Sequence, residues 1–402
     1  MRAFELVKTN AGAAGVDQQS LKDFEKDLKN NLYKLWNRLC SGSYFPPPVK
    51  AVPIPKKSGG ERILGVPTVS DRIAQMVVKL QFEAKVEPYF LEDSYGYRPN
   101  KSALKGIEVT RKRCWQYDWV LEFDIVGLFD HISHNLLEKA ICKHTDCPWT
   151  ILYLKRWLKA PMQMSDGKLV ERNCGTPQGG VVSPLLSNLF LHYVFDKWME
   201  RNHPEVPWCR YADDGVVHCQ TEKQAQQLLS ELRQRFEECG LKLHPEKTQI
   251  VYCKDGKRKE QYERTSFKFL GYCFKGRWCK NKKRNIFFMS FTPAASKEAL
   301  KSMRAKTRKL GWRKRADLSL NEIARRYNPV LQGWLNYFGH YRSSELYSVW
   351  RHLNRTLVAW ARRKYKSLRE HKIKAAKWLE EIAKRQPKLF VHWRVGMLGS
   401  FA

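Results

Sequence analysis

The chain has 402 residues, which exceeds one typical domain and predicts two or three domains. Its formal net charge is +33, from 73 Lys and Arg against 40 Asp and Glu, and a field of this size attracts polyanions. Nucleic acid is therefore the expected partner. The 14 Trp and 17 Tyr spread along the chain argue against a membrane-surface protein. No apolar run of about 18 residues and no signal-peptide core occurs, so we expect a soluble, non-secreted protein without membrane contact.

Cysteine usage points to reduced thiols. The chain has 11 cysteines, an odd number, and none of them lies in a Cys-x-x-Cys pair. Cys142 with Cys147, or Cys273 with Cys279, have spacings compatible with metal ligands, but no His or Cys pair lies nearby to complete such a site. We therefore expect neither a zinc site nor a disulfide framework.

The first expected element is an amphipathic helix over residues 17–39, where apolar residues recur at helical spacing. Residues 49–55 and 62–66 resemble strands on either side of a basic turn, which predicts a hairpin. Further helices are expected over residues 71–87, up to residue 113, and over 134–144, 151–158 and 184–199, with a short strand over 119–125. Strands and a helix then alternate to Phe274. This order predicts an α/β body with its sheet covered on one side.

The composition changes after about residue 290, where the chain becomes helical, Trp-rich and strongly basic. Residues 290–402 contain 26 Lys and Arg against 7 Asp and Glu, so this stretch supplies +19 of the +33 total. We expect it to form a separate binding module.

The strongest local signal is Tyr211-Ala212-Asp213-Asp214-Gly215, which lies between two strand-like segments and predicts a hairpin with an Asp-Gly turn. Two adjacent carboxylates repel each other unless a cation neutralises them, so the pair suits a hard divalent metal such as Mg²⁺. An isolated Asp-Asp-Gly sequence is more often a solvated turn.

A further carboxylate strengthens the metal interpretation. Asp124 ends an apolar strand about ninety residues earlier, and two such strands can lie side by side. Asp124 and Asp213 could then share two ions about 4 Å apart, one activating a 3′-hydroxyl and the other stabilising pyrophosphate. Phosphoryl transfer needs little else from a protein beyond positioning and positive charge.

Nine segments in order resemble the sequence blocks of group II intron reverse transcriptases. They are residues 12–17, 54–57, 64–68, 94–99, 124–130, 175–184, 211–214, 243–248 and 269–272. The resemblance implies an α/β (α+β) right-hand polymerase, with fingers and palm over residues 1–285.

By this resemblance the catalytic residues are Asp124, Asp213, Asp214 and Lys247. The three aspartates and the backbone of Ile125 would bind two Mg²⁺ ions, for which Mn²⁺ could substitute. Lys247 resembles a lysine that protonates the pyrophosphate leaving group.

The resemblance also implies a nucleotide-binding set. Its members are Lys56, Lys57, Arg62, Phe129, Gln178 and Gly179. The three basic residues would offset the charge of the triphosphate. Phe129 would collide with a ribose 2′-hydroxyl and favour deoxynucleotides, Gln178 would lie near the sugar and base, and Gly179 would let the backbone approach closely. Each assignment has an alternative. The basic residues could form a solvated turn, Phe129 could be an ordinary core residue, and the loop with Gly179 could be an ordinary turn.

One departure from the family pattern concerns Val126, which stands where the family usually has a lysine. Leu128 in place of the commoner phenylalanine is a milder change. The metal-binding carboxylates remain, so activity is still expected. Loss of the positive charge would reduce catalytic efficiency.

Residues 327–338 resemble the maturase-specific block, which implies a helical thumb over residues 286–365 and a basic extension over 366–402. Trp334, Tyr337 and Phe338 occur at helical spacing and are expected in the thumb core rather than as base-stacking platforms. The expected nucleic-acid contacts are Arg98, Asn100, Arg351, Arg355, Arg362, Arg363 and Lys364. No His-Asn-His endonuclease pattern follows, so second-strand nicking by this chain is not expected.

The resemblance as a whole implies an RNA-directed DNA polymerase that also binds a group II intron RNA as a maturase, supporting splicing and retromobility. Its partners would be structured intron RNA, an RNA template, a DNA primer or target DNA, and deoxynucleoside triphosphates, in a cytoplasmic ribonucleoprotein of bacterial or organellar type. Two alternatives stay open: a domesticated enzyme of DNA repair or phage defence, and a splicing-only RNA-binding cofactor, which Val126 favours. The oligomeric state cannot be predicted from the sequence.

Overall fold

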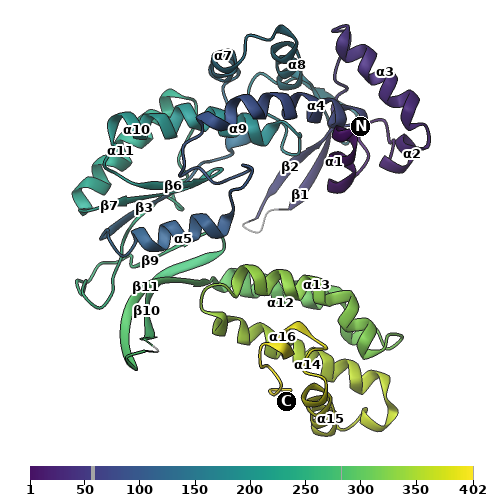
Figure 1. Ribbon diagram of the computed structural model, residues 1–402, viewed down its shortest axis with the longest axis vertical. Coiled ribbons are helices and arrows are strands. Elements are labelled where there is room, and N and C mark those ends of the chain that lie inside the picture. The colour runs from purple at the N-terminus through teal and green to yellow at the C-terminus, as the bar shows by residue number, and fades with distance from the viewer. Residues whose placement is uncertain (56–58, 282, 402) are drawn as a thin grey trace. The chain divides into compact units, whose positions relative to one another are not determined.

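The computed structural model describes residues 1–55, 59–281 and 283–401 (Figure 1). The chain forms two compact units. The first comprises residues 1–110 and 119–250, and the second comprises residues 111–118 and 251–402. The division therefore falls near residue 250 instead of the predicted residue 285. The reason is that the last three strands pair only with one another, in a sheet of their own.

The first unit begins with helices where the sequence predicted one. The predicted helix over residues 17–39 is two helices, α2 (Leu21–Lys26) and α3 (Leu28–Cys40), preceded by α1 (Arg2–Asn10). The chain leaves the helical conformation at Asp27, which has φ −126° and ψ 49°. Ser20 starts α2 by accepting a hydrogen bond from the Asp23 backbone N–H at 3.2 Å.

The predicted basic hairpin is confirmed as β1 (Val49–Pro55) and β2 (Glu61–Val66), with Ile54 opposite Arg62. Two short strands that were not predicted, β4 (Met162–Gln163) and β5 (Leu169–Val170), extend this sheet in the order β2-β1-β4-β5. Lys56 and Lys57 lie outside the described residues, so their predicted role stays a prediction.

A second sheet of the first unit has the order β6-β7-β3-β8. Its strands are β3 (Trp119–Asp124), β6 (Trp208–Tyr211), β7 (Asp214–Cys219) and β8 (Gln249–Tyr252). Helix α11 (Glu222–Glu238) packs across β3 and β7 (Figure 1). Phe123 is buried, with its ring 5.8 Å from that of Phe236 on α11, whereas Asp124 is only half-buried. Alternation along the strand therefore leaves the carboxylate on the more open face.

The other helices of the first unit lie close to the predicted positions, except for η1 and α6, which were not predicted. They are α4 (Val69–Val86), η1 (Glu87–Tyr89), α5 (Ala103–Arg113), α6 (Leu128–His131), α7 (His134–His144), α8 (Pro148–Lys159), α9 (Ser183–Leu191), η2 (His192–Asp196) and α10 (Lys197–Asn202). The single helix predicted over residues 184–199 contains a π-helical turn, η2, between α9 and α10. Such turns often occur at functional positions.

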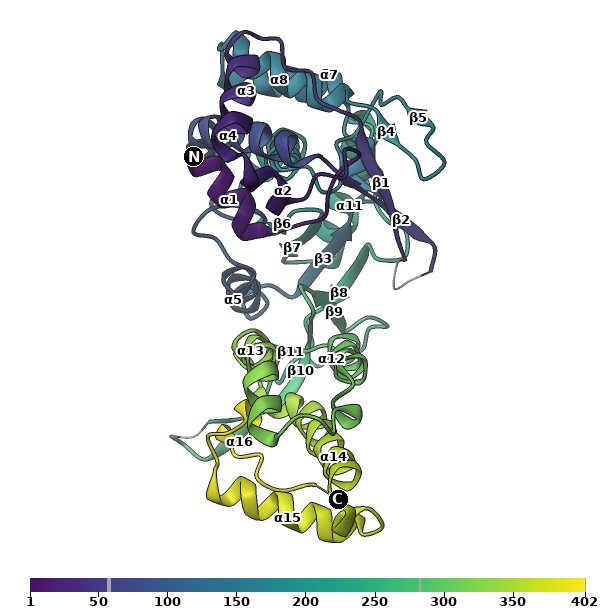
Figure 2. The ribbon, with the colours of Figure 1, turned by 90° about the vertical axis from the view of Figure 1, so that its right-hand side faces the viewer.

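The second unit starts with an antiparallel sheet of order β11-β10-β9, formed by β9 (Ser266–Phe269), β10 (Tyr272–Asn281) and β11 (Ile286–Ala295). Helices and short 3₁₀ turns follow: α12 (Lys297–Leu310), η3 (Trp312–Lys314), α13 (Leu320–Phe338), η4 (Ser343–Leu346), α14 (Tyr347–Lys364), η5 (Lys366–Leu368), α15 (Lys372–Arg385) and α16 (Val391–Arg394). They gather around α14, as the green and yellow ribbons of Figure 2 show.

One hydrophobic core joins these helices. It contains Trp312, Trp350, Trp360 and Trp393, so the segment after residue 365 packs with the predicted thumb instead of forming a separate extension. Trp334 and Phe338 pack against this core, and the Tyr337 hydroxyl donates to the Leu270 carbonyl at 2.8 Å. The predicted core role is thus confirmed for Trp334 and Phe338, whereas Tyr337 binds the chain at Leu270.

No disulfide joins the cysteines of the described residues. Within the same residues, no helix combines the length and the apolarity needed to cross a membrane.

Candidate active site

Strand pairing brings the predicted carboxylates together at one end of the β6-β7-β3-β8 sheet. Strands β3 and β7 are antiparallel neighbours, with Asp124 directly opposite Asp214. Residues opposite each other in this way have Cβ atoms about 4.5–5.5 Å apart. Asp213 lies next to Asp214, in the turn that joins β6 to β7. The expectation that the two strands lie side by side is confirmed.

The expected Asp-Gly turn is wrong in detail. The turn consists of Ala212 and Asp213, and Ala212 has the positive φ of 55°. Gly215 lies inside β7 and pairs with Arg210 and Phe123. A Cβ atom at Gly215 would overlap the Phe123 ring. The glycine is therefore required by ring packing on the adjacent strand and not by the turn.

Crowding of negative charge changes the acidity of this cluster. Burial raises the pKa of Asp213, and the Asp124 charge acts in the same direction, whereas Arg62 opposes it. Burial and the charges of Asp213 and Asp124 raise the pKa of Asp214 to about 8. The carboxylates are thus poorly neutralised by the protein alone.

Lys247 is the cation that contacts this cluster directly. Its Nζ lies 2.7 Å from Oδ2 of Asp124. Partial burial lowers the pKa of Lys247, but the hydrogen bond to Asp124 and the charges of the three aspartates together outweigh that effect and raise it above its usual value. The backbone of the same segment is held in place because the His244 N–H donates to the Asp124 carbonyl at 2.8 Å.

The donor set suits a hard divalent cation, although no group of three His, Cys, Asp or Glu in the described part of the chain is already arranged as ligands. Carboxylate oxygens are the ligands that Mg²⁺ prefers. The Lys247 ammonium occupies the position of a counter-cation at Asp124. Ile125, the predicted backbone ligand, directly follows Asp124 and forms a β-bridge with Leu243.

The predicted nucleotide-binding loop, residues 175–180, is tied to two neighbouring elements. Gln178 Nε2 donates to the Asp130 carboxylate at 3.0 Å, and the Gly65 N–H on β2 donates to the Gln178 carbonyl at 2.8 Å. The Thr176 N–H donates to the Phe129 carbonyl at 2.6 Å. Gly179 has φ 120°, and a Cβ atom there would overlap the Gly65 carbonyl oxygen. Only glycine fits there without a shift.

The sequence did not predict the buried residues on α4 that support this loop through hydrogen bonds. Gln75 on α4 accepts a hydrogen bond from the Val181 N–H at 2.7 Å and donates to Asp71 at 2.9 Å. The buried Asp71 carboxylate also accepts from the Tyr44 hydroxyl at 2.8 Å and from Trp157 Nε1 at 2.7 Å. Asp71 and Gln75 are four residues apart, and two polar residues at that spacing in an apolar helix are a signal that could have found them.

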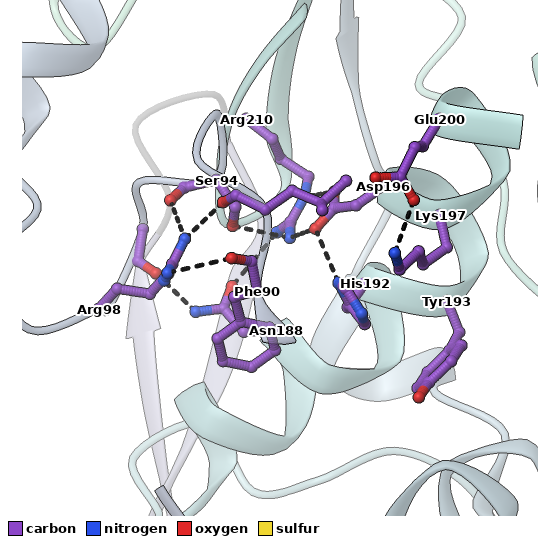
Figure 3. A network of polar contacts seen from close by, with 12 residues as sticks. Phe90, Ser94, Arg98, Asn188, His192, Tyr193, Asp196, Lys197, Glu200 and Arg210 are labelled. Carbon is purple, nitrogen blue, oxygen red and sulfur yellow. Dashed lines mark hydrogen bonds and ion pairs between the residues drawn. The ribbon is translucent and has the colours of Figure 1, made fainter. Parts of the chain in front are cut away.

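A second buried network, also missed, supports the carboxylate hairpin (Figure 3). Arg210 and Asp196 form a fully buried ion pair with Nη2 and Oδ2 2.6 Å apart. Arg210 Nη1 donates to the Ala212 carbonyl at 3.2 Å, and Nη2 donates to Ser94 Oγ at 2.9 Å. Burial acts to raise the pKa of Asp196, but Arg210 reverses this and holds the pKa below its usual range.

The same network joins the hairpin to the loop over residues 94–99. Asp196 is the last residue of the π-helical turn η2, which lies between α9 and α10. A Cβ atom at Gly96 would overlap the Ala212 backbone, so the loop and the turn are in close contact. Asn188 donates to the Gly96 carbonyl and accepts from Arg210. These contacts hold the loop and the carboxylate turn as one assembly.

Arg98 was expected to contact nucleic acid, but its guanidinium is directed inward. It pairs with Glu87 at 2.8 Å and donates to the carbonyls of Leu91 at 2.6 Å and Ser94 at 2.9 Å. We therefore infer that Arg98 anchors its own loop. Asn100 is exposed, with φ 60°.

In the second unit, the basic residues predicted on α14 fall into two groups. Arg351, Arg355 and Arg363 are exposed. Lys364 donates to the carbonyls of residues 316 and 318 at 2.9 and 3.0 Å, and Arg362 Nε donates to the carbonyl of residue 369 at 2.9 Å. The three exposed arginines are better placed for phosphate, because their side chains reach solvent.

Four arginines act on His352 of α14 through their charges, and of these only Arg355 was predicted as a nucleic-acid contact. Burial lowers the pKa of His352, and the charges of Arg308, Arg304, Arg313 and Arg355 lower it further. Arg304 and Arg308 are four residues apart on α12, so they share one face of that helix. We call these four arginines the α12–α14 arginine cluster. Like charges gathered in this way suit a polyanion.

Comparison with known proteins agrees with this arrangement. The family model described as "Reverse transcriptase (RNA-dependent DNA polymerase)" matches residues 54–274, and "Group II intron, maturase-specific domain" matches residues 300–378. The chain is 32% identical over 288 residues to "Protein YkfC" of Escherichia coli K12, covering 62% of this chain and 75% of that protein.

It is also 33% identical over 201 residues to "Group II intron-encoded protein LtrA" of Lactococcus lactis subsp. cremoris. That match covers 49% of this chain and only 33% of LtrA. A solved structure of apo telomerase from Candida tropicalis aligns with TM-score 0.45 and 16% identity over 60% of this chain and 59% of that one, a likeness too slight to carry an argument. The reverse transcriptase model covers more than half of the chain and is followed by the maturase-specific model, so this chain belongs to the reverse transcriptase family and carries the maturase-specific domain of group II introns.

Proposed function

We propose that this protein copies RNA into DNA at the Asp124–Asp213–Asp214 cluster and binds a structured group II intron RNA as a maturase, supporting splicing and retromobility. The observation that carries the polymerase assignment is the register that places Asp124 opposite Asp214 beside a turn bearing Asp213. A structural role alone does not explain why three acidic groups are held together at a site where burial and their mutual repulsion raise the pKa of Asp214 to about 8.

The three aspartates, with the backbone of Ile125, would hold two Mg²⁺ ions, which activate the primer 3′-hydroxyl and stabilise the leaving pyrophosphate when bound. Mn²⁺ has compatible ligand preferences. Lys247, which pairs with Asp124 at the edge of the cluster, would donate a proton to the pyrophosphate leaving group.

Nucleotide selection would lie with residues at the edges of this cluster. Arg62 projects from β2, and its charge already acts on Asp213, so it is suited to a triphosphate. Gln178 and Gly179 present a loop braced by Gly65, and Phe129 lies half-buried on α6 beside them. In this proposal the Phe129 ring excludes the ribose 2′-hydroxyl.

Intron RNA would bind the second unit through the α12–α14 arginine cluster with Arg351 and Arg363. Arg98, Arg362 and Lys364 are left out of this proposed set, because their charged groups donate hydrogen bonds to backbone carbonyls of the protein. Template RNA, DNA primer and deoxynucleoside triphosphates would be bound by the first unit, and a cytoplasmic ribonucleoprotein is the setting we propose.

The decisive experiment compares Asp124→Asn, Asp213→Asn and wild type in extension of a DNA primer on an RNA template. Each substitution removes a metal ligand, and removing a group needed at the reacting centre lowers the rate by several orders of magnitude. RNA affinity should stay within about two-fold, because a single charge changes. Asp166→Asn is the matched control, since Asp166 is an exposed carboxylate of another turn. Extension at the wild-type rate by either site variant would refute the assignment.

A splicing-only cofactor is the second candidate, because Val126, exposed beside Asp124, stands where the family usually has a lysine. It predicts that wild-type protein supports intron splicing but extends no primer with either Mg²⁺ or Mn²⁺. Restored extension by Val126→Lys would then identify the missing charge as the cause.

A further inference from the structure

The β10–β11 hairpin carries large apolar side chains that nothing in the described structure covers. Near its base the hairpin is packed, with Phe274 and Phe291 fully buried. Further out, Trp278 is 63% exposed and Phe287 is 64% exposed, and on the opposite face Ile286 is 57% exposed. Exposed apolar groups gathered in this way mark an interaction surface.

The register places the two most exposed rings on one face. Trp278 is opposite Met289 and Lys280 is opposite Phe287, so all four share a face of the hairpin. Trp278 and Phe287 are diagonal neighbours, which places their backbones about 7–8 Å apart. The Lys280 ammonium lies 5.6 Å from the centre of the Phe287 ring. The hairpin thus presents two rings with a cation beside them.

The charge of the hairpin region indicates the class of its binding partner. Residues 265–296 contain seven Lys and Arg and neither Asp nor Glu. The hairpin is also fixed to the helical part of its own unit, because Arg342 Nη1 donates to the Trp278 carbonyl at 3.1 Å. A basic surface with protruding rings is the arrangement by which proteins bind single-stranded nucleic acid: bases stack on the rings and cations contact phosphates.

We propose that the outer part of the β10–β11 hairpin binds an unpaired stretch of RNA, with bases stacked on Trp278 and Phe287 and Lys280 contacting the backbone phosphate. The residues of this surface differ from those of the carboxylate cluster and of the α12–α14 arginine cluster. It rests on the proposed function only for the choice of RNA as the polyanion.

The test measures binding of a fluorescent, unstructured RNA of about twelve nucleotides to the full-length protein, without nucleoside triphosphates. Trp278→Ala and Phe287→Ala should each weaken binding by roughly 5- to 150-fold, the range for loss of one stacked base. Trp278→Phe and Phe287→Tyr should retain most of the affinity, because a ring remains. Lys280→Gln should lower the salt slope by about 0.7.

The matched control is Ile286→Ala, which removes an equally exposed apolar side chain from the same hairpin but no ring. It should change RNA affinity by less than about two-fold, since only rings stack. Thermal unfolding of each variant should match wild type, because the substituted side chains are exposed.

Four results would overturn the proposal: unchanged affinity in both alanine variants, an equal loss in Ile286→Ala, stronger binding of a duplex or of DNA than of single-stranded RNA, or self-association of wild type that Trp278→Ala abolishes. If wild type binds no RNA of any kind, the maturase part of the proposed function fails with it. If wild type binds RNA and only the hairpin variants behave as wild type, the hairpin proposal alone fails.

Discussion

Arginine is used in opposite ways in the two units. In the first unit, Arg210 is fully buried, is paired with Asp196 and braces the carboxylate turn. In the second unit, burial lowers the pKa of His352, and the like charges of the α12–α14 arginine cluster lower it further. The comparison shows that total charge does not identify a nucleic-acid surface. What distinguishes the two regions is whether a guanidinium is buried in an ion pair, like that of Arg210, or exposed to solvent, like that of Arg355.

The largest expected effect is at Arg210. Arg210→Ala would leave Asp196 buried without its partner, and breaking a buried pair in this way costs about 3–5 kcal/mol of unfolding free energy. Urea unfolding measures the loss. The comparison variant Arg355→Ala, which changes an exposed arginine of the other unit, should stay within about 0.5 kcal/mol of wild type. Equal unfolding free energies of the two variants would contradict the proposal that Arg210 is structural and Arg355 is not.

The next effect is on RNA binding by the arginine cluster. Replacing Arg304, Arg308, Arg313 and Arg355 together with glutamine should reduce the slope of log affinity against log salt by about three to four, if each contacts a phosphate. Primer extension on a short template should continue, because the carboxylates are untouched. A filter-binding salt titration on a structured intron RNA measures the slope.

The control for that titration removes the same charge from the first unit. Its four substitutions to glutamine are at the exposed residues Lys22, Lys29, Lys34 and Arg38. A larger change in slope from this control than from the cluster variant would move RNA recognition to the first unit.

A smaller effect concerns pH and sharpens the contrast within the second unit. Burial lowers the pKa of His392 to about 3, because the ring is enclosed beside Asn354. The unfolded chain then binds a proton that the folded chain does not, so stability is full above about pH 6.5 and falls as the pH decreases toward 3. At pH 5 the loss relative to the stability at high pH should reach about 2 kcal/mol, since each pH unit below 6.5 contributes at most about 1.4 kcal/mol.

Denaturant midpoints of the second unit at several pH values test this. His392→Gln should flatten the dependence, whereas His371→Gln, at an exposed histidine, should leave it unchanged. His352 contributes in the same direction, because its pKa is also lowered. A midpoint of wild type that does not move between pH 7 and 5 would contradict the buried neutral state of His392.

Much of the architecture could be predicted from the sequence, because local patterns carry it. Helical periodicity located α7 over residues 134–144, and strand alternation located β1 over residues 49–55. The same approach missed the division of the long helices at Asp27 and at η2, because a single non-helical residue or a π turn hardly changes the apolar spacing.

The sequence by itself determined the charge balance, most element positions and the carboxylates Asp124, Asp213 and Asp214, because charge, periodicity and motif spacing are all properties of the linear chain. Only the tertiary structure decided which arginines are exposed, because burial and pairing depend on contacts between distant segments. Arg98 resembled a surface cation but binds Glu87, and Arg210 meets Ser94, which lies 116 residues away in the chain. The same reason explains Gly215: its requirement comes from the Phe123 ring on a neighbouring strand, which no local pattern can reveal.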